Sequence, residues 1–197
     1  MLFQVLCGFE PIFYTTHPNE EPIKGIKKMK QTDNFKFDEA NVMNELVYRN
    51  LSEDAKRQIC AWKYGGEYDL YNLPAYEEMQ VRQIGFMNPK SEKNYYGFWD
   101  ESILVGFVNI LEEKEEVFIG IGVNPDLCNK HYGQRMLLIT YEISKKLYPN
   151  KPLYLEVRTW NIRAVKCYQK AGFRIDGQAY ELTTGIGTGT FYRMIRE

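Results

Sequence analysis

Three short apolar runs joined by tight polar turns, with a long amphipathic segment after them, constrain the fold of this chain more than any other feature. We expect strands at residues 95–99, 103–110 and 117–123, because the links between these runs are only long enough for hairpins. Apolar residues then recur at spacings of three and four over residues 131–147, which predicts a helix with one buried face. An antiparallel meander followed by a covering helix is typical of a mixed α/β sheet.

The rest of the chain carries signals for further strands and helices. Met43 opens a run expected to be the first strand, and Ser52 can cap a helix that ends at Gly65. Pro74 fits the first turn of a second helix, which should stop near Gly85. A strand at residues 153–159 and a short helix at residues 161–171 are expected to follow. A hairpin should then form from residues 173–182 and 189–195. This order predicts one mixed α/β sheet built as a single unit.

Residues 1–42 differ from the residues that follow. Residues 17–36 are polar and rich in lysine, with two prolines and no sustained periodicity. We therefore expect an N-terminal extension at residues 1–42 and one domain at residues 43–197. Two explanations stay open: the native protein starts at Met43, or the extension is an ordinary part of it.

Composition excludes several classes of function. The chain has 197 residues, of which 44% are hydrophobic and 26% charged, as expected for a packed core. A net charge of −1 provides no overall field for binding nucleic acid or an anionic membrane. No apolar run approaches the roughly 18–20 residues that cross a bilayer, and the start lacks the basic region of a signal peptide. We therefore expect neither nucleic acid nor a membrane as a partner.

The cysteine and histidine pattern bears on metals and on redox state. The four cysteines are widely spaced and form no CxxC pair, and the chain has only two histidines. This pattern disfavours a zinc site and a disulfide framework. We expect no metal, reduced thiols and a cytoplasmic location.

A candidate anion site lies between two predicted elements. A strand ends at Val123 and a helix begins near His131, where unpaired N–H groups and the helix dipole favour a phosphate. Gly133 would let a ligand approach the backbone, while Lys130 and Arg135 add positive charge. A glycine kept for packing is an equally good interpretation. The motifs GxxxxGK(S/T) and GxGxxG are absent, which disfavours a P-loop and a nicotinamide site.

The most specific motif lies in the predicted short helix. Asn161, Ala164, Tyr168, Gly172 and Phe173 form the pattern N-x-x-A-x-x-x-Y-x-x-x-G-F. This pattern resembles the GCN5-related N-acetyltransferase (GNAT) superfamily.

The segment upstream adds to this resemblance. Residues 130–135 resemble the family's acetyl-coenzyme A motif, R/Q-x-x-G-x-G/A, and a V-x-P sequence precedes them. Two positions depart from the motif: Lys130 stands where Arg or Gln is usual, and Arg135 stands where a small residue is usual. A large side chain there could crowd a pyrophosphate or pair with it. Residues 49–55 are similar to the family's opening strand and helix, so the resemblance covers residues 43–197.

The resemblance implies a particular sheet and coenzyme site. The sheet should splay between its fourth and fifth strands, at residues 117–123 and 153–159. The pantetheine arm of acetyl-coenzyme A should lie in that gap and pair with the backbone of the fourth strand. The coenzyme contacts that the resemblance implies are Ile121, Val123, Lys130, His131, Tyr132, Gly133, Gln134, Arg135 and Asn161.

The implied reaction is the transfer of an acetyl group from acetyl-coenzyme A to a primary amine by direct attack. Tyr168 resembles the family's general acid at the sulfur, and a purely packing role is the competing interpretation. The general base stays open between Glu115, which shares strand parity with inward positions of the fourth strand, and Glu156. A solvated hairpin tip explains Glu115 equally well.

The acceptor site of this family is built partly from the link between the first two helices, here residues 64–73. Glu67 and Asp69 could attract an ammonium group, and Tyr68 and Tyr71 present ring faces to it. A solvated loop with inward tyrosines is the alternative. Polyamine, antibiotic amine, amino acid and protein N-terminus all stay open as acceptors, and a homodimer is compatible with the sequence. A rival function is a coenzyme-binding regulatory or interaction module without turnover.

The polarity of residues 1–42 leads to a first prediction. A chain that begins at Met43 should fold with a melting temperature close to that of the full chain, because the removed segment carries no periodic apolar face. Calorimetry on both chains measures this. An insoluble shorter chain, or one that melts several degrees lower, would show that the segment packs on the domain.

Overall fold

The computed structural model of the protein describes residues 46–197. Residues 1–42, expected to form an extension, lie outside the described residues, and so does Met43. The boundary between the extension and the domain therefore stays a prediction.

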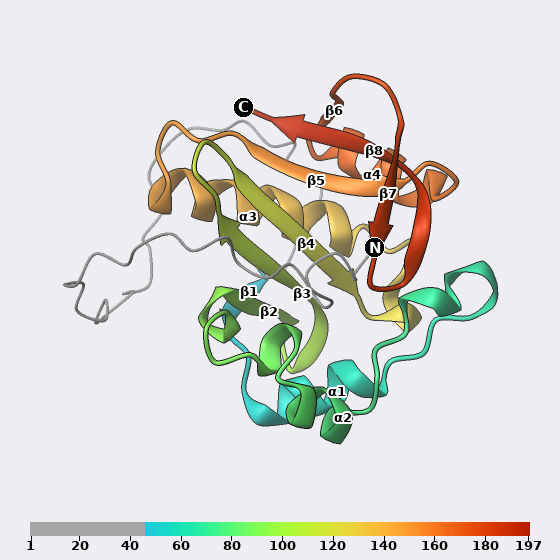
Figure 1. Ribbon diagram of the computed structural model, residues 1–197. Coiled ribbons are helices and arrows are strands. Elements are labelled where there is room, and N and C mark those ends of the chain that lie inside the picture. The colour runs from blue at the N-terminus through green and yellow to red at the C-terminus, as the bar shows by residue number, and fades with distance from the viewer. Residues whose placement is uncertain (1–45) are drawn as a thin grey trace.

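A single sheet organises the described part of the chain (Figure 1). Its strands follow the order β1-β2-β3-β4-β5-β8-β6, and β7 pairs with β8 beside this path. The neighbouring strands run antiparallel except for the parallel pair β4 and β5. The strands are β1 (Val47–Asn50), β2 (Tyr95–Asp100), β3 (Ile103–Glu112), β4 (Val117–Val123), β5 (Leu153–Arg158), β6 (Arg174–Ile175), β7 (Tyr180–Thr184) and β8 (Gly187–Arg196).

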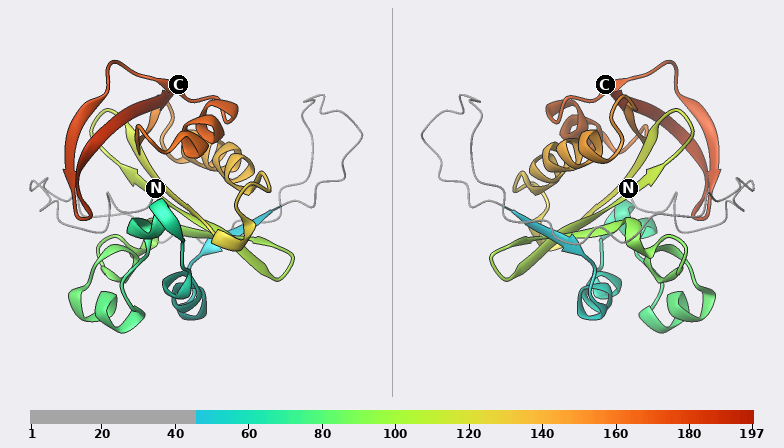
Figure 2. Two further views of the ribbon diagram at one scale, coloured as in Figure 1. Left: turned by 90° about the vertical axis from the view of Figure 1, so that its right-hand side faces the viewer. Right: turned by 90° about the vertical axis from the view of Figure 1, so that its left-hand side faces the viewer.

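Helices cover both faces of the sheet (Figure 2). Helices α3 and α4 pack on one face, which we call the α3 face, and α1 and α2 pack on the other, the α1 face. The helices are α1 (Glu53–Ala61), α2 (Tyr76–Arg82), α3 (Tyr132–Leu147) and α4 (Ile162–Lys170). Short 3₁₀ helices are η1 (Gly66–Tyr71), η2 (Gly85–Met87), η3 (Glu92–Asn94) and η4 (Pro125–Leu127). A core of buried side chains lies on each face.

Strands β4 and β5 pair only where they begin. Val117 lies opposite Leu153 and Phe118 lies opposite Tyr154, and no further register pair joins the two strands. Because both strands run in the same direction, they part toward their C-terminal ends. The splayed mixed sheet predicted from the sequence is therefore confirmed.

Alternation along β4 decides which side chains reach which face. Ile119 and Ile121 are buried in the same core as Met136 of α3. The intervening residues Gly120 and Gly122 therefore turn to the α1 face. The absence of side chains at these two positions leaves that face of β4 open beside the gap.

The same alternation sorts the residues of β5. Leu155 and Val157 belong to the core under α3 and α4. Glu156 and Arg158 consequently turn to the α1 face, where Glu156 lies opposite Arg193 of β8 in the strand register. The α1 face of β5 thus carries charged groups.

Polar caps set where the helices begin and end. The Ser52 hydroxyl accepts a hydrogen bond from the amide of Ala55 at 3.3 Å, and the Asn161 side chain accepts one from the amide of Ala164 at 3.2 Å. Gly172, with φ of 88°, terminates α4. The capping predicted from the sequence at both helices is confirmed.

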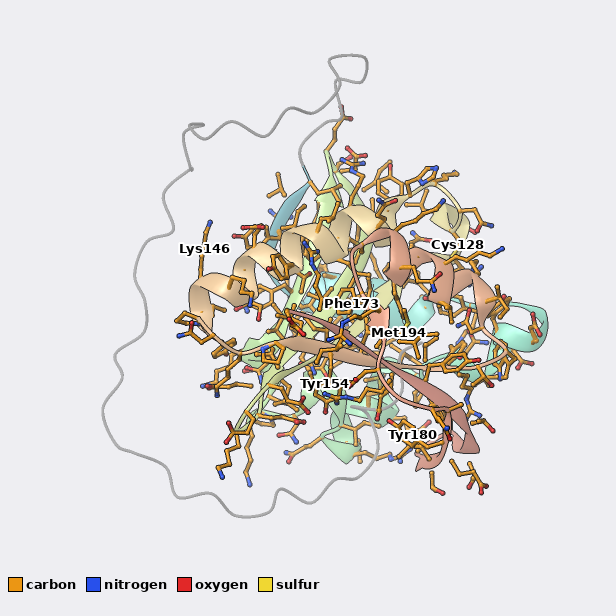
Figure 3. The ribbon with its side chains drawn as sticks, turned by 90° about the horizontal axis from the view of Figure 1, so that it is seen from above. Cys128, Lys146, Tyr154, Phe173, Tyr180 and Met194 are labelled. Carbon is orange, nitrogen blue, oxygen red and sulfur yellow. The ribbon has the colours of Figure 1, made fainter. Side chains whose placement is uncertain are left out.

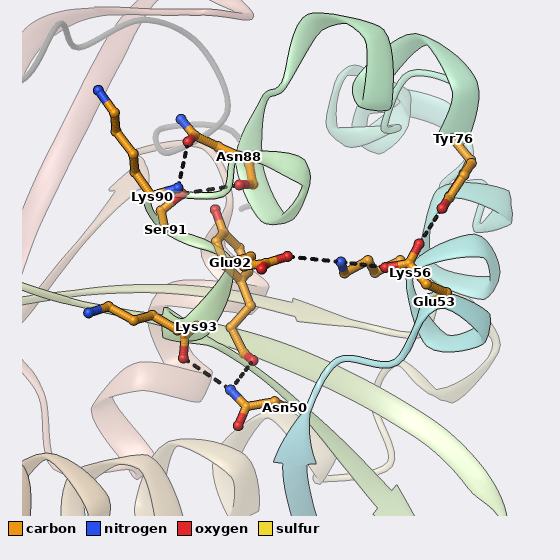
Figure 4. Close-up of polar contacts among 11 residues, drawn as sticks. Asn50, Glu53, Lys56, Tyr76, Asn88, Lys90, Ser91, Glu92 and Lys93 are labelled. Carbon is orange, nitrogen blue, oxygen red and sulfur yellow. Dashed lines mark hydrogen bonds and ion pairs between the residues drawn. The ribbon is translucent and has the colours of Figure 1, made fainter. Parts of the chain in front are cut away.

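A buried lysine ties α1 to the segment before β2 (Figure 4). Lys56 Nζ lies 2.7 Å from Glu53 Oε1 and 3.4 Å from Glu92 Oε2. Burial opposes the charge on Lys56, but hydrogen bonds and charges from the two carboxylates leave its pKa raised. Asn50 donates to the carbonyl of Lys93 at 3.0 Å and fixes the end of β1 to the same segment. These contacts hold α1, and the chain that leaves it, against the sheet.

Two expectations about local structure differ from the fold. The strand predicted at residues 173–182 is divided into β6 and β7, because the chain turns at Gly177 with φ of 77°. Asp176 marks the break, and its carboxylate accepts from Arg193 Nε at 3.2 Å. Part of the link predicted as a loop at residues 64–73 forms the 3₁₀ helix η1.

The close approach of α3 to the sheet leads to a prediction about Gly106 on β3. A Cβ there would lie 2.5 Å from the Gly122 carbonyl oxygen and 2.6 Å from Met136 Sδ. Gly106→Ala should therefore lower the free energy of unfolding by about 1–3 kcal/mol through overpacking. Gly65→Ala is the matched control, because a Cβ at Gly65 meets no atom within 4 Å. Equal unfolding free energies for the two variants in urea would contradict the packing described here.

Candidate active site

A cleft of about 300 Å³ opens where β4 and β5 part. The end of β4, the loop after it, the first turn of α3 and one face of α4 form its walls, and two tyrosines enter from the segment after α1. The cleft is lined by Tyr64, Tyr71, Ile121, Gly122, Val123, Leu127, Cys128, Asn129, His131, Tyr132, Gly133, Gln134, Asn161, Arg163, Ala164, Lys166, Cys167 and Lys170. Figure 3 shows Cys128 on the helix side of β5 and β8, with Tyr180 on the opposite side.

The N-terminus of α3 points its first amides toward the cleft. His131 is the N-cap residue with φ of 63°, and no side chain of residues 46–197 caps this end of the helix. Gly133 is buried, and a Cβ there would lie 3.1 Å from Cys167 Sγ of α4. The glycine thus allows α3 and α4 to approach, as the packing interpretation requires, and its place at a helix N-terminus that lines the cleft is compatible with a bound anion.

Helix α4 adds a row of positive charge. Arg163, Lys166 and Lys170 line the cleft at spacings of three and four, which is one helical face. These residues were not predicted as site residues, although their spacing on a predicted helix indicates one basic face. Burial raises the pKa of the neighbouring Cys167 to about 11, so its thiol stays neutral and does not oppose a bound phosphate.

Most residues predicted to contact a coenzyme converge on this cleft. Seven of them line it: Ile121, Val123, His131, Tyr132, Gly133, Gln134 and Asn161. Two lie outside the lining, namely Lys130, which is exposed, and Arg135. Arg135 lies with one guanidinium nitrogen 3.7 Å from the Asp100 carboxylate, which also accepts from the Tyr132 hydroxyl at 2.8 Å. The structure therefore corrects both sequence expectations about Arg135: its side chain turns to the end of β2, where it neither crowds the cleft nor lines it.

A side chain from the segment after α1 forms a hydrogen bond with the backbone of β4. The Tyr64 hydroxyl donates to the Val123 carbonyl at 2.7 Å. Asn161 caps α4 with its side-chain oxygen and directs its amide nitrogen to the Tyr71 hydroxyl at 3.5 Å. The segment after α1 thus closes one end of the cleft with two phenol groups.

Tyr168 lies behind the cleft lining. Its side chain is 1% exposed, and its ring packs 6.4 Å from the ring of Phe173. Burial raises its pKa well above the ordinary value, and Cys167, Tyr71 and Tyr64 add to the shift. The phenol is therefore protonated at neutral pH and close to the two tyrosines that line the cleft.

The two candidate bases lie in different surroundings. Glu115 is 81% exposed at the tip of the β3–β4 hairpin, with its carboxylate 3.7 Å from Lys114. It lies six residues before Ile121 along the strand, or about 20 Å. Its placement outside the cleft corrects the expectation from strand parity.

Glu156 is partly buried on β5 and accepts a hydrogen bond from the Tyr180 hydroxyl. Burial raises its pKa above the ordinary value, although Tyr180 and Arg193 act in the opposite direction. A carboxylate with a raised pKa beside the strand gap has the properties of a general base.

The predicted acceptor segment divides into two parts. Tyr68 and Tyr71 of η1 pack with Trp160, with ring centroids 5.6 and 5.9 Å from the indole. Arg163 lies 4.2 Å above the Tyr68 ring. The carboxylates that were expected to attract the amine, Glu67 and Asp69, are exposed and do not line the cleft, because the 3₁₀ helix turns its apolar side inward. Only Tyr71 of the predicted set reaches the cleft lining.

Three further features of residues 46–197 concern the cysteines, metal-binding groups and membrane-spanning helices. Cys60, Cys128 and Cys167 are free thiols. Within this range no group of three or more His, Cys, Asp or Glu side chains could hold a metal ion. None of the helices described is long and apolar enough to span a bilayer.

The geometry agrees with a family assignment from sequence. The model of the acetyltransferase (GNAT) family matches residues 57–173, which is more than half of the chain. The chain therefore belongs to this family. No curated protein sequence matches it.

Solved structures share the fold. A GNAT-family acetyltransferase from Bacillus anthracis has a TM-score of 0.60 and 16% identity over 77% of this chain and 94% of that chain. Spermidine N-acetyltransferase from Vibrio cholerae, in complex with CoA and spermine, has a TM-score of 0.62 and 17% identity, covering 77% and 95%. An aminoglycoside acetyltransferase in complex with coenzyme A and kanamycin has a TM-score of 0.60 and 16% identity, covering 77% and 94%. At these identities the likeness shows the fold.

The charged face of α4 leads to a prediction about coenzyme affinity. Replacing Lys166 and Lys170 together by Ala should weaken coenzyme A binding about tenfold at low salt, since exposed charge pairs contribute up to about 1 kcal/mol each. The difference should shrink as salt increases. Isothermal titration measures both effects, with Lys114→Ala, at a side chain 80% exposed on the β3–β4 hairpin, as the control. Unchanged affinity in the double variant would place the phosphates elsewhere.

Proposed function

We propose that the chain is an acetyl-coenzyme A-dependent N-acetyltransferase that acetylates a primary amine by direct attack on the thioester. The observation that carries this proposal is the cleft itself. It joins an uncapped helix N-terminus, a basic helix face and the free edge of a splayed strand in one site.

The residues present fit the coenzyme. The first-turn amides of α3, with Lys166 and Lys170, would hold its phosphates. The edge of β4 at Ile121 and Val123, where the Tyr64 hydroxyl also contacts the Val123 carbonyl, would pair with its amide groups. Bound there, acetyl-coenzyme A would supply an acetyl thioester that an unprotonated amine can attack.

A proton donor is needed for the leaving thiolate. Tyr168 is the candidate that the sequence motif favours, and its raised pKa keeps the hydroxyl protonated. Tyr71 is a second candidate because it lines the cleft and its hydroxyl is within reach of Asn161. Either phenol would transfer its proton to the leaving thiolate, at the end of the cleft where β4 and β5 part.

A base is needed to remove a proton from the ammonium form of the acceptor. Glu156 faces the α1 face of the gap, and its carboxylate is partly withdrawn from water. It would accept the proton that an ammonium group must lose before attack. The hydrogen bond from Tyr180 orients the carboxylate.

The rival interpretation, a coenzyme-binding module without turnover, drew its support from Arg135 in the phosphate motif. Arg135 pairs with Asp100 and does not line the cleft. This contact weakens the argument for the rival.

Removing single hydroxyl groups tests the proton donor. Tyr168→Phe should lower kcat by about 10²–10⁴-fold with coenzyme affinity nearly unchanged, because general acid catalysis contributes that much. Tyr71→Phe carries the same loss if Tyr71 is the donor. Tyr141→Phe is the control, since its hydroxyl donates to the Glu197 carbonyl at 2.8 Å on another part of the surface. Full kcat in both site variants, with chemistry limiting the rate, would mean that the thiolate leaves unprotonated.

The pH profile tests Glu156. A base acts only when ionised, so kcat/KM should rise with pH through a pKa above the ordinary carboxyl value of 4.5. Glu156→Gln should abolish this limb and lower kcat/KM about 10²-fold or more. Glu115→Gln should leave the profile intact. A profile altered by Glu115→Gln and not by Glu156→Gln would reverse the assignment.

A further inference from the structure

The α1 face of the sheet carries buried polar atoms without partners. Among residues 46–197 these include both side-chain atoms of Asn109, the Tyr95 hydroxyl and Arg158 Nε. Asn109 lies opposite Gly120 of β4 in the strand register, beside the gap. Such atoms cost free energy unless a ligand or water satisfies them, so this face has the properties of a polar binding site.

Arg158 stands out because it is a buried charge. Its residue exposure is 8%, and no carboxylate within residues 46–197 forms an ion pair with it. Among residues 46–197 its guanidinium donates to the carbonyls of Gly187 at 3.1 Å and Thr188 at 3.3 Å, and lies 4.9 Å from the centre of the Phe191 ring. Two neutral carbonyls do not neutralise a cation withdrawn from water, so an anion beside this guanidinium would be stabilised.

The β7–β8 hairpin is shaped around this guanidinium. A Cβ at Gly189 would collide with Arg158 Nη1, so the glycine leaves the space that the side chain occupies. Ile186 at the hairpin tip packs against the core of the α1 face. The hairpin therefore contacts both Arg158 and the core of the α1 face.

Arg158 also lies next to the reacting end of the cleft. Its backbone carbonyl accepts from the amide of Asn161 at 2.9 Å, and its charge acts on the hydroxyl of Tyr71, which lines the cleft. Glu156 lies two residues before it on the same face of β5, or about 7 Å along the strand. One small molecule can therefore span a carboxylate and a guanidinium here.

We infer that the acceptor is a primary amine that carries a carboxylate, of the α-amino acid class, with its carboxylate bound by Arg158 and its amine directed to Glu156. This inference rests on the proposed function and deepens it. A polycation would place a positive charge against this guanidinium, whereas an amino acid supplies an anion for it and leaves its amine for the carboxylate.

Matched acceptor pairs test the inference with the full-length protein. Each pair consists of an α-amino acid and the amine formed by removing its carboxylate, for example tyrosine and tyramine, with spermidine as a polycation. Release of coenzyme A thiol should be at least about 10²-fold more efficient in kcat/KM for the preferred amino acid than for its amine, because one buried charge partner is lost. Equal or better turnover of the amine or of spermidine overturns the inference and leaves the proposed function standing.

Variants and a binding measurement complete the test. Arg158→Met should raise KM about 10²-fold for the amino acid and leave the much weaker turnover of its amine unchanged, and Arg158→Lys should restore part of the loss. Arg174→Met is the control, because Arg174 is 61% exposed and pairs with Glu197. If Arg158→Met does not fold, the comparison of each amino acid with its amine in the wild-type protein decides whether the inference holds.

Calorimetric titration of the same amino acids into the protein saturated with coenzyme A separates binding from turnover. Binding without thiol release would refute the proposed function and keep the site. Absence of binding for every amino acid would refute the site.

Discussion

The two-residue pairing of β4 and β5 is the constraint on which the rest of the structure depends. After Phe118 and Tyr154 the facing edges of these parallel strands are not joined to each other, so their backbone groups need other partners. The Val123 carbonyl finds one in the Tyr64 hydroxyl. An opening inside a sheet is stable only if the surrounding elements hold the strands apart. Helix α3 does so on one side by packing on Ile119 and Ile121, and the pairing of β5 with β8 does so on the other.

This opening joins two faces of opposite chemical character. On the α3 face the cleft presents helix amides and the basic groups of α4, which suit an anionic coenzyme. On the α1 face the residues are a carboxylate, a hydroxyl and a guanidinium that no carboxylate of residues 46–197 pairs with, carried by Glu156, Tyr180 and Arg158. Strand alternation produces this difference, because adjacent residues of β5 point to opposite faces. In the proposed reaction the coenzyme and the amine would each enter from its own side.

The sequence predicted the fold and seven of the residues that line the cleft, for a physical reason. Periodicity and caps are local properties, so the helix after His131 and the cap at Asn161 could be read directly. Arg135 and Glu115 show where such reasoning stops. Motif position could not reveal that Arg135 turns to Asp100, which is 35 residues away in sequence, and strand parity could not show that Glu115 lies at the exposed tip of a hairpin. Arg158 was missed because an arginine in an apolar strand carries no local sign of which groups surround its guanidinium.

The sequence predicts a final hairpin of two continuous strands. In the structure the first of these strands is broken into β6 and β7, and this break affects the position of Tyr180. Since β6 pairs with the end of β8 and β7 with its beginning, the chain between them is free to turn at Gly177. Five residues separate Ile175 from Tyr180, but their partners Met194 and Phe191 on β8 are three residues apart, so the turn takes up two residues. The turn therefore sets where Tyr180 lies along β8, and its hydroxyl donates to Glu156. The break in regular pairing thus positions a hydroxyl on the carboxylate that the proposed function uses as a base.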